Sequence, residues 1–124
     1  MKKKKILVIE DEKALQAAIK SKLEKNGAEV FSARRVSDAM KILKKAGKVD
    51  VIWLDHYLLG EKSGMDFVME IKDNKEWGNI PIFVVSNTAT HDKIQSYLKL
   101  GVHKYYTKSN LKLDDIVQEI MLLK

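Results

Sequence analysis

The chain alternates between short apolar runs and longer stretches in which apolar residues recur every three or four positions. The short runs have the length of strands, whereas the longer stretches have the period of amphipathic helices. The pattern therefore predicts five strands alternating with five helices. The predicted strands are Lys5–Ile9, Glu29–Ser32, Val49–Leu54, Ile82–Val85 and His103–Thr107.

Capping residues and glycines mark the ends of the predicted helices. The helices are Lys13–Lys25, a second capped by Ser37 and stopped by Gly47, a third begun by Ser63, then Thr90–Leu100 and Leu113–Leu123. In Thr90–Leu100 we expect Ile94, Tyr97 and Leu98 to form the buried side.

Alternating strands and helices need right-handed crossovers, which produce a parallel sheet covered by helices on both faces. The nearly unbroken apolar run Val49–Leu54 is typical of a central strand, so Trp53 is expected in the core. Trp77 lies in a polar loop, where it either packs under the loop or contacts a partner. Because no repeat, linker or second domain is evident, we expect residues 1–124 to form one α/β domain.

The composition narrows the class of protein. With 45% hydrophobic and 32% charged residues, the chain is predicted to be soluble and globular, and it contains no apolar run long enough to span a membrane. The run after the first lysines is too short for a signal peptide, so we expect a cytoplasmic protein. The absence of cysteine excludes disulfides and thiolate chemistry. The net charge of +6 owes much to Lys2–Lys5, a solvated lead-in that could alternatively contact nucleic acid.

Reactive side chains follow four of the predicted strands. The segment Glu10-Asp11-Glu12 ends the first strand, Asp55 the third, Ser86 the fourth and Lys108 the fifth. Because ligands bind at the carboxyl ends of strands in such sheets, we expect these groups to meet there. Clustered carboxylates repel one another unless a proton or cation neutralises them, and Mg²⁺ prefers such oxygen ligands. Asp55, on the central strand, is the best-placed nucleophile for an aspartyl-phosphate, with Lys108 and Ser86 holding phosphoryl oxygens.

Four segments carry a family resemblance: ILVIEDE, VIWLDHYLLGEKSGMDFV, IPIFVVSN and GVHKYYTKS. Together they resemble the receiver domain of two-component response regulators, in its stand-alone, chemotaxis-type form, over essentially the whole chain. The resemblance implies a flavodoxin-like three-layer (βα)5 sandwich with strand order 2-1-3-4-5. It also implies a phosphorylation-switched signalling protein without an output domain, which catalyses only its own phosphorylation and dephosphorylation.

By the same resemblance, Asp11 would bind Mg²⁺ directly and Glu10 mainly through water. Asp55 would be both phosphoacceptor and metal ligand, and the backbone carbonyl of Tyr57 a further ligand. Ser86 and Lys108 would hold the phosphoryl group. Tyr105 would be the aromatic that moves inward when Ser86 is drawn to that group. From their positions two residues after Asp55 and Ser86, we further expect Tyr57 and Thr88 to border the path of attacking water, and bulky Tyr57 to slow dephosphorylation. The alternative for Tyr57 is a surface aromatic without a role.

The resemblance also implies partners. A histidine kinase, a histidine phosphotransfer protein or a small phosphodonor such as acetyl phosphate would supply the phosphoryl group. A downstream protein, or a second copy in a phosphorylation-dependent dimer, would bind the face of the fourth helix, fifth strand and fifth helix. Neither direct nucleic-acid nor membrane binding is implied.

Departures from the family pattern leave alternatives open. Leu59 and Ser109 stand where proline is usual, and Asn87 where a small residue is usual. Without the proline, the usual cis peptide after Lys108 is not expected, and the following loop could take a different path. One alternative is therefore a constitutive interaction scaffold that is never phosphorylated. A flavodoxin-like cofactor enzyme is a weaker alternative, because the first strand is followed by acids rather than a glycine-rich phosphate loop. His56 and His103 are expected to be hydrophobic or exposed filler residues rather than metal ligands or phosphohistidines, because neither has a ligand partner at helical spacing.

Overall fold

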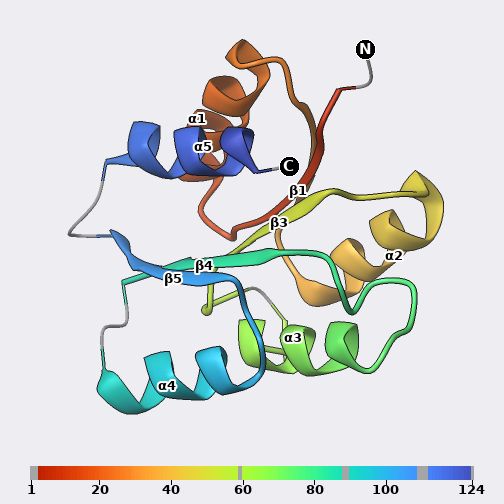
Figure 1. Cartoon of the computed structure of the whole chain (residues 1–124), viewed down its shortest axis with the longest axis vertical. Helices are drawn as coiled ribbons and strands as arrows, with labels where there is room; N and C mark the ends of the chain where they lie inside the picture. Colours follow the sequence, from red (N-terminus) through yellow and green to blue (C-terminus); the bar gives the residue numbers. More distant parts are fainter. Residues whose placement is uncertain (1–2, 59, 88–89, 109–111, 124) are drawn as a thin grey trace.

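The computed structural model describes residues 3–58, 60–87, 90–108 and 112–123. Its strands form one parallel sheet in the order β2-β1-β3-β4-β5 (Figure 1). This arrangement confirms the predicted flavodoxin-like fold class. The strands are β1 (Lys5–Ile9), β2 (Glu29–Ala33), β3 (Val51–Leu54), β4 (Ile82–Ser86) and β5 (Lys104–Thr107).

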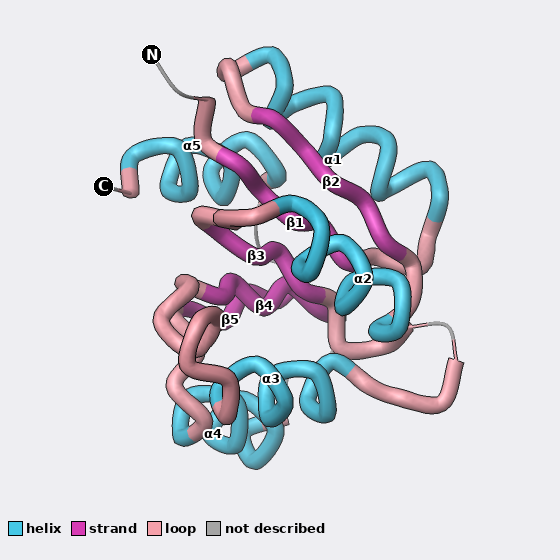
Figure 2. The backbone as a smooth tube through the Cα atoms, turned by 90° about the vertical axis from the view of Figure 1, so that its right-hand side faces the viewer, coloured by secondary structure: helices cyan, strands magenta, loops and turns pink. Residues whose placement is uncertain are grey.

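The helices cover both faces of the sheet. Helices α1 and α5 lie on one face and α2, α3 and α4 on the other, with the sheet as the middle layer (Figures 1 and 2). The helices are α1 (Lys13–Lys25), α2 (Val36–Ala46), α3 (Gly64–Lys72), α4 (His91–Lys99) and α5 (Leu113–Leu122).

Successive residues of the central strands enter different hydrophobic cores, because side chains alternate between the faces of a strand. In β1, Leu7 and Ile9 pack on the side of α2, α3 and α4, whereas Ile6 and Val8 pack on the side of α1 and α5. Strands β1 and β3 are therefore buried on both faces, which explains their unbroken apolar sequences. Trp53 is fully buried in the second core, as predicted.

Most helix ends follow the predicted signals. Ser63 caps α3, and its hydroxyl oxygen accepts a hydrogen bond from the amide of Asp66, whose carboxylate accepts one from the Ser63 amide. The prediction that Ser37 caps α2 is wrong. The cap residue is Arg35, and the helix begins at Val36, whose burial in the core outweighs the capping preference of serine.

The predicted buried side of α4 is only partly correct. Tyr97 is fully buried, but Leu98 is 42% exposed, because adjacent helix positions point about 100° apart. Trp77 is buried beside the α2, α3 and α4 core, so of the two possibilities for its loop, packing is confirmed. Three residues singled out in the sequence lie outside the described part of the chain. They are Leu59 and Ser109, which depart from the family pattern, and Thr88, for which a kinetic role is predicted.

Candidate functional site

Strand register brings Glu10 and Asp55 together at the carboxyl end of the sheet. Ile9 of β1 pairs with Leu54 of β3, and the Asp55 amide donates a 3.0 Å hydrogen bond to the Ile9 carbonyl. Glu10 and Asp55 are the next residues of their strands, so their side chains leave the sheet side by side. In neighbouring parallel strands, the residues that follow a paired couple such as Ile9 and Leu54 lie close together whatever their type.

Asp11 completes an acidic cluster with these two residues. One carboxylate oxygen from each of Glu10, Asp11 and Asp55 lies within 4.8 Å of the others. Glu10 is fully buried, and Asp55 is only 4% exposed. The sequence prediction that two separate strand ends contribute carboxylates to one place is thus met by the geometry.

Lys108 reaches this acidic cluster from the end of β5. Its ammonium group lies 2.8 Å from a Glu10 oxygen and 3.3 Å from an Asp55 oxygen. The Lys108 side chain is only 17% exposed. The predicted opposition of one ammonium group to several carboxylates is therefore present, and the three carboxylates still outnumber it.

Burial sets the electrostatics of the cluster. Burial raises the pKa of Glu10 to about 7, because desolvation outweighs the hydrogen bonds from Lys108 and the Glu12 amide that favour the carboxylate. For Lys108, burial alone would lower the pKa, but the hydrogen bond with Glu10 and the charges of Asp55 and Glu10 raise it. Lys108 is thus held as a cation beside Glu10, whose raised pKa comes mainly from burial and to a lesser extent from the charge of Asp55.

The side chains of Ser86, the last residue of β4, and Tyr105 of the neighbouring β5 are hydrogen-bonded to each other. Ser86 is fully buried, and Tyr105 is partly buried against the core formed with α2, α3 and α4. Burial raises the pKa of Tyr105, although its hydrogen bond with Ser86 acts in the opposite direction. The Tyr105 ring also lies 5.7 Å, centroid to centroid, from Tyr97 of α4. A contact path therefore runs from Ser86 through Tyr105 to α4.

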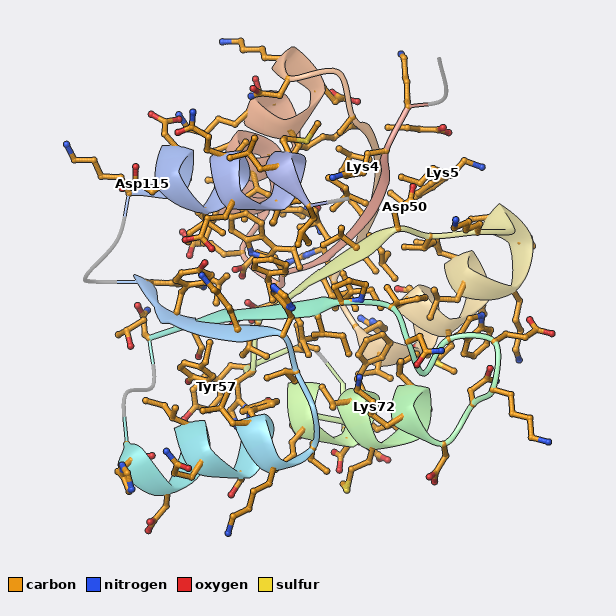
Figure 3. The ribbon with its side chains drawn as sticks, viewed as in Figure 1. Lys4, Lys5, Asp50, Tyr57, Lys72 and Asp115 are labelled. Atoms are coloured by element: carbon orange, nitrogen blue, oxygen red, sulfur yellow. The ribbon has the colours of Figure 1, made fainter. Side chains whose placement is uncertain are left out.

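Tyr57 differs from these residues in its exposure. It is 57% exposed and lies between the sheet and α4 (Figure 3). The ammonium group of Lys93 lies 5.4 Å from the centre of its ring, a cation–π contact. The exposed ring of Tyr57 is thus held against a side chain of α4.

Comparison with known proteins assigns the chain to a family. The response regulator receiver domain family matches residues 6–121. This chain is a response regulator receiver domain. It therefore belongs to two-component signalling, and it is a signalling domain rather than an enzyme that acts on other substrates.

Individual relatives agree with the assignment. A chemotaxis protein CheY homolog of Campylobacter jejuni is 28% identical over 105 residues, which cover 84% of this chain and 80% of the relative. A transcriptional regulatory protein of Bacillus subtilis, YvrH, is 34% identical, but the match spans only 42% of its length.

Solved structures also resemble this receiver domain. The phosphorylated cyanobacterial phytochrome response regulator RcpA is 31% identical, with a TM-score of 0.83 over 97% of this chain and 90% of that chain. The Mn²⁺-bound form of the response regulator Rcp1 is 28% identical, with a TM-score of 0.79 over 95% and 89% of the two chains.

The acidic cluster of this receiver domain has the donor set of a hard-cation site. Carboxylate oxygens from adjacent strand ends converge there, and Mg²⁺ prefers one or two carboxylates together with water and phosphate oxygens. The residues present therefore fit Mg²⁺ and a phosphoaspartate. Within the described part of the chain, every helix is too short or too polar to cross a bilayer.

Of the two placements that the sequence left open for His56, hydrophobic or exposed, the structure has the buried one, with hydrogen bonds that the sequence did not indicate. His56 is 9% exposed, and its Nδ1 lies 2.5 Å from the Tyr97 hydroxyl, while its Nε2 lies 3.1 Å from the ammonium group of Lys93. Burial and the Lys93 charge lower the pKa of His56. Its position beside Asp55 was the one available signal. His103, in contrast, is exposed and lies against Phe83, so its expected filler role agrees with its placement.

Two side chains that hold the acidic loop also escaped the sequence analysis. Arg34 donates from Nε and a terminal nitrogen to the Asp11 carbonyl, at 3.0 and 2.9 Å. Gln16 of α1 donates from Nε2 to the carbonyls of Glu10 and Ala33, at 3.1 and 2.9 Å. Because their acceptors are backbone carbonyls, which every residue has, no sequence pattern marks these contacts.

Proposed function

We propose that the receiver domain accepts a phosphoryl group on Asp55 in the presence of Mg²⁺ and changes the surface of α4, β5 and α5 for a protein partner. The observation that carries this proposal is the meeting of Glu10, Asp11 and Asp55 within 4.8 Å, with Lys108 against two of them. We further propose that residues 1–124 act as one receiver unit.

In this proposal, Asp11 and Asp55 hold Mg²⁺ directly, Glu10 holds it mainly through water, and the Tyr57 backbone carbonyl completes the protein ligands. The ion, when bound, neutralises negative charge on the cluster and on the incoming phosphoryl oxygens. The fit of the donor set and the Mn²⁺-bound state of the similar Rcp1 structure support this choice of ligands.

The chemical step belongs to Asp55. A carboxylate oxygen forms a bond to phosphorus while the bond between phosphorus and the donor breaks, and the electron pair of that bond leaves with the donor. With acetyl phosphate the leaving group is acetate, and with a phosphohistidine it is the imidazole. Lys108 and Ser86 hold phosphoryl oxygens, so Lys108 exchanges a carboxylate partner for a phosphoryl partner.

The signal would travel from Ser86 to Tyr105. When Ser86 turns toward the phosphoryl group, its hydrogen bond with Tyr105 changes, and Tyr105 moves relative to Tyr97 and α4. Phosphorylation thereby shifts the balance between two arrangements of the α4-β5-α5 surface. The phosphoryl donor would be a histidine kinase or histidine phosphotransfer protein, and the target a downstream protein. The cytoplasmic location predicted from the sequence stays a prediction.

The deciding experiment is intact mass spectrometry after treatment with acetyl phosphate and Mg²⁺. The wild-type chain should gain the mass of one phosphoryl group, and Asp55→Asn should gain none. Asp50→Asn is the matched control, because Asp50 lies at the opposite end of β3, where it binds the Lys5 amide, and this variant should be modified like the wild type. If the wild type stays unmodified and fails to bind beryllofluoride with Mg²⁺, the constitutive scaffold is the better description.

A further inference from the structure

Arg34 contributes no side-chain group to the acidic cluster, yet it is bonded to the loop that carries it. The residue follows β2, whereas its acceptor, the Asp11 carbonyl, follows β1. Two guanidinium nitrogens share that one oxygen, at 3.0 and 2.9 Å. Because the guanidinium group is planar and its donors are fixed in direction, a forked contact of this kind fixes the orientation of the peptide as well as its position.

The same short loop is fastened at the preceding residue. The Glu10 amide donates to the Ala33 carbonyl at 3.0 Å, and Gln16 joins the Glu10 and Ala33 carbonyls. The Glu10 carboxylate, in turn, accepts a 3.0 Å hydrogen bond from the Glu12 amide. Glu10 is thus fixed by strand pairing, but the described contacts of the Asp11 backbone with a side chain are those of Arg34.

Electrostatics argues against placing a cation here. The guanidinium group of Arg34 binds the backbone of Asp11, whose carboxylate we propose to bind Mg²⁺. Its positive charge by itself must therefore weaken cation binding. A side chain whose charge is unfavourable to the ion, and whose two described hydrogen bonds both go to the loop backbone, is explained by the loop geometry that it imposes.

We propose that Arg34 is a positioning residue that orients Asp11 for Mg²⁺ by holding the Asp11 carbonyl. This inference rests on the proposed function, since it assumes that the acidic cluster binds Mg²⁺. Groups that orient a metal ligand from outside the coordination shell typically change affinity by about 10–100-fold when removed. Neutralising Arg34 should therefore weaken Mg²⁺ binding if Arg34 acts by positioning Asp11, and strengthen it if only the charge of Arg34 matters.

The test is a titration of the metal-free protein with MgCl₂, followed by the amide chemical shifts of the cluster residues. Arg34→Gln should weaken Mg²⁺ binding about tenfold, although it removes a repelling charge. Arg34→Lys should also weaken binding several-fold, since it keeps the charge but loses the fork. Arg35→Gln is the matched control, because Arg35 is exposed, faces Asp38 at 3.8 Å and carries the same charge. This control should bind Mg²⁺ as tightly as the wild type, or slightly more tightly.

Each outcome separates the two proposals. Unchanged or tighter binding by Arg34→Gln, or unchanged binding by Arg34→Lys, would overturn the positioning role while leaving the metal site intact. A wild-type chain that shows no saturable Mg²⁺ binding would overturn the proposed function and this inference with it. Thermal unfolding without Mg²⁺ checks folding, and if Arg34→Gln fails to fold, Arg34→Lys still decides between geometry and charge.

Discussion

The imidazole of His56, next to Asp55 in sequence, is hydrogen-bonded to the phenol of Tyr97 on α4, with 2.5 Å between Nδ1 and the hydroxyl oxygen. Lys93 identifies the tautomer. An ammonium group can only donate, so the Nε2 atom facing it at 3.1 Å must accept, and the proton of the neutral ring is on Nδ1. His56 therefore donates to Tyr97. The segment that follows β3 and α4 are therefore joined by a hydrogen bond that is separate from the contact between Ser86 and Tyr105.

We predict that Tyr97→Phe lowers the free energy of unfolding by about 1–3 kcal/mol, because it leaves the buried His56 donor without its partner. Urea denaturation measures this change. Tyr106→Phe is the matched control, since it removes a tyrosine hydroxyl that bonds Glu119 near the surface, and it should have a smaller effect. In a cycle with His56→Leu, the double variant should lose less stability than the sum of the single variants. Additive losses would contradict the coupling.

Gly64, the first residue of α3, should not tolerate a side chain. A Cβ there would lie 2.7 Å from the Asp55 carbonyl oxygen and 2.9 Å from the Tyr97 hydroxyl. We expect Gly64→Ala to lower the free energy of unfolding by about 1–3 kcal/mol through overpacking. Adding Tyr97→Phe should restore little, because the backbone carbonyl remains in the way. If Gly64→Ala is as stable as the wild type in urea denaturation, the backbone around Gly64 must shift at little cost to make room for the Cβ.

Lys108 should stabilise the metal-free protein by offsetting the charge of the acidic cluster. Lys108→Met leaves Glu10 and Asp55 without their cation, so we expect the free energy of unfolding to fall by about 2–3 kcal/mol. Adding Mg²⁺ should reduce the difference in free energy of unfolding between Lys108→Met and the wild type, because the ion replaces the missing positive charge. Lys62→Met, which breaks the exposed pair with Glu70, is the control and should change the free energy of unfolding much less, because solvent screens this pair. An equal effect of the two substitutions would contradict this assignment.

Under the proposed function, we expect the exposed Tyr57 ring, which Lys93 contacts, to cover one path of water to Asp55 and so to slow loss of the phosphoryl group. Under the proposed function, phosphorylated Tyr57→Asn should decay several-fold faster than the wild type, as followed by the phosphorylated fraction in intact mass spectra. Tyr57→Phe keeps the ring and should decay like the wild type. The same half-life for Tyr57→Asn and the wild type would exclude a shielding role.

The network between β5 and α5 predicts an acid-sensitive contribution to stability. Hydrogen bonds from Lys104 and Tyr106 lower the pKa of Glu119 below its ordinary value of 4.5. A depressed carboxyl pKa means that this contribution is fully present above about pH 4.5 and disappears as the pH falls through the folded-state pKa. Because these groups are substantially exposed, the effect should be small. Urea denaturation of Glu119→Gln and the wild type should show a stability difference at pH 6 that shrinks toward pH 3, whereas a constant difference would refute the assignment.

Much of this receiver domain follows from local sequence patterns. The apolar runs of β1 and β3 specify strands buried on both faces, because each residue must be apolar whichever face it joins. The alternation of strand and helix also explains why the acidic residues after these strands meet, because parallel strands direct their carboxyl ends to one edge of the sheet. The sequence alone therefore assigns one region of the fold to the following residues: Glu10, Asp11, Asp55, Ser86 and Lys108.

Other features depend on which surfaces meet after the chain has folded. Arg34 reaches Asp11 across 23 residues and His56 reaches Tyr97 across 41, and neither separation matches a helix or strand period. A backbone carbonyl carries no residue identity, so the acceptor of Arg34 is invisible in the sequence. The inward position of Tyr97 and the exposure of Leu98 likewise depend on how α4 packs against the sheet. Packing decides these contacts because they connect elements whose relative placement no local pattern encodes.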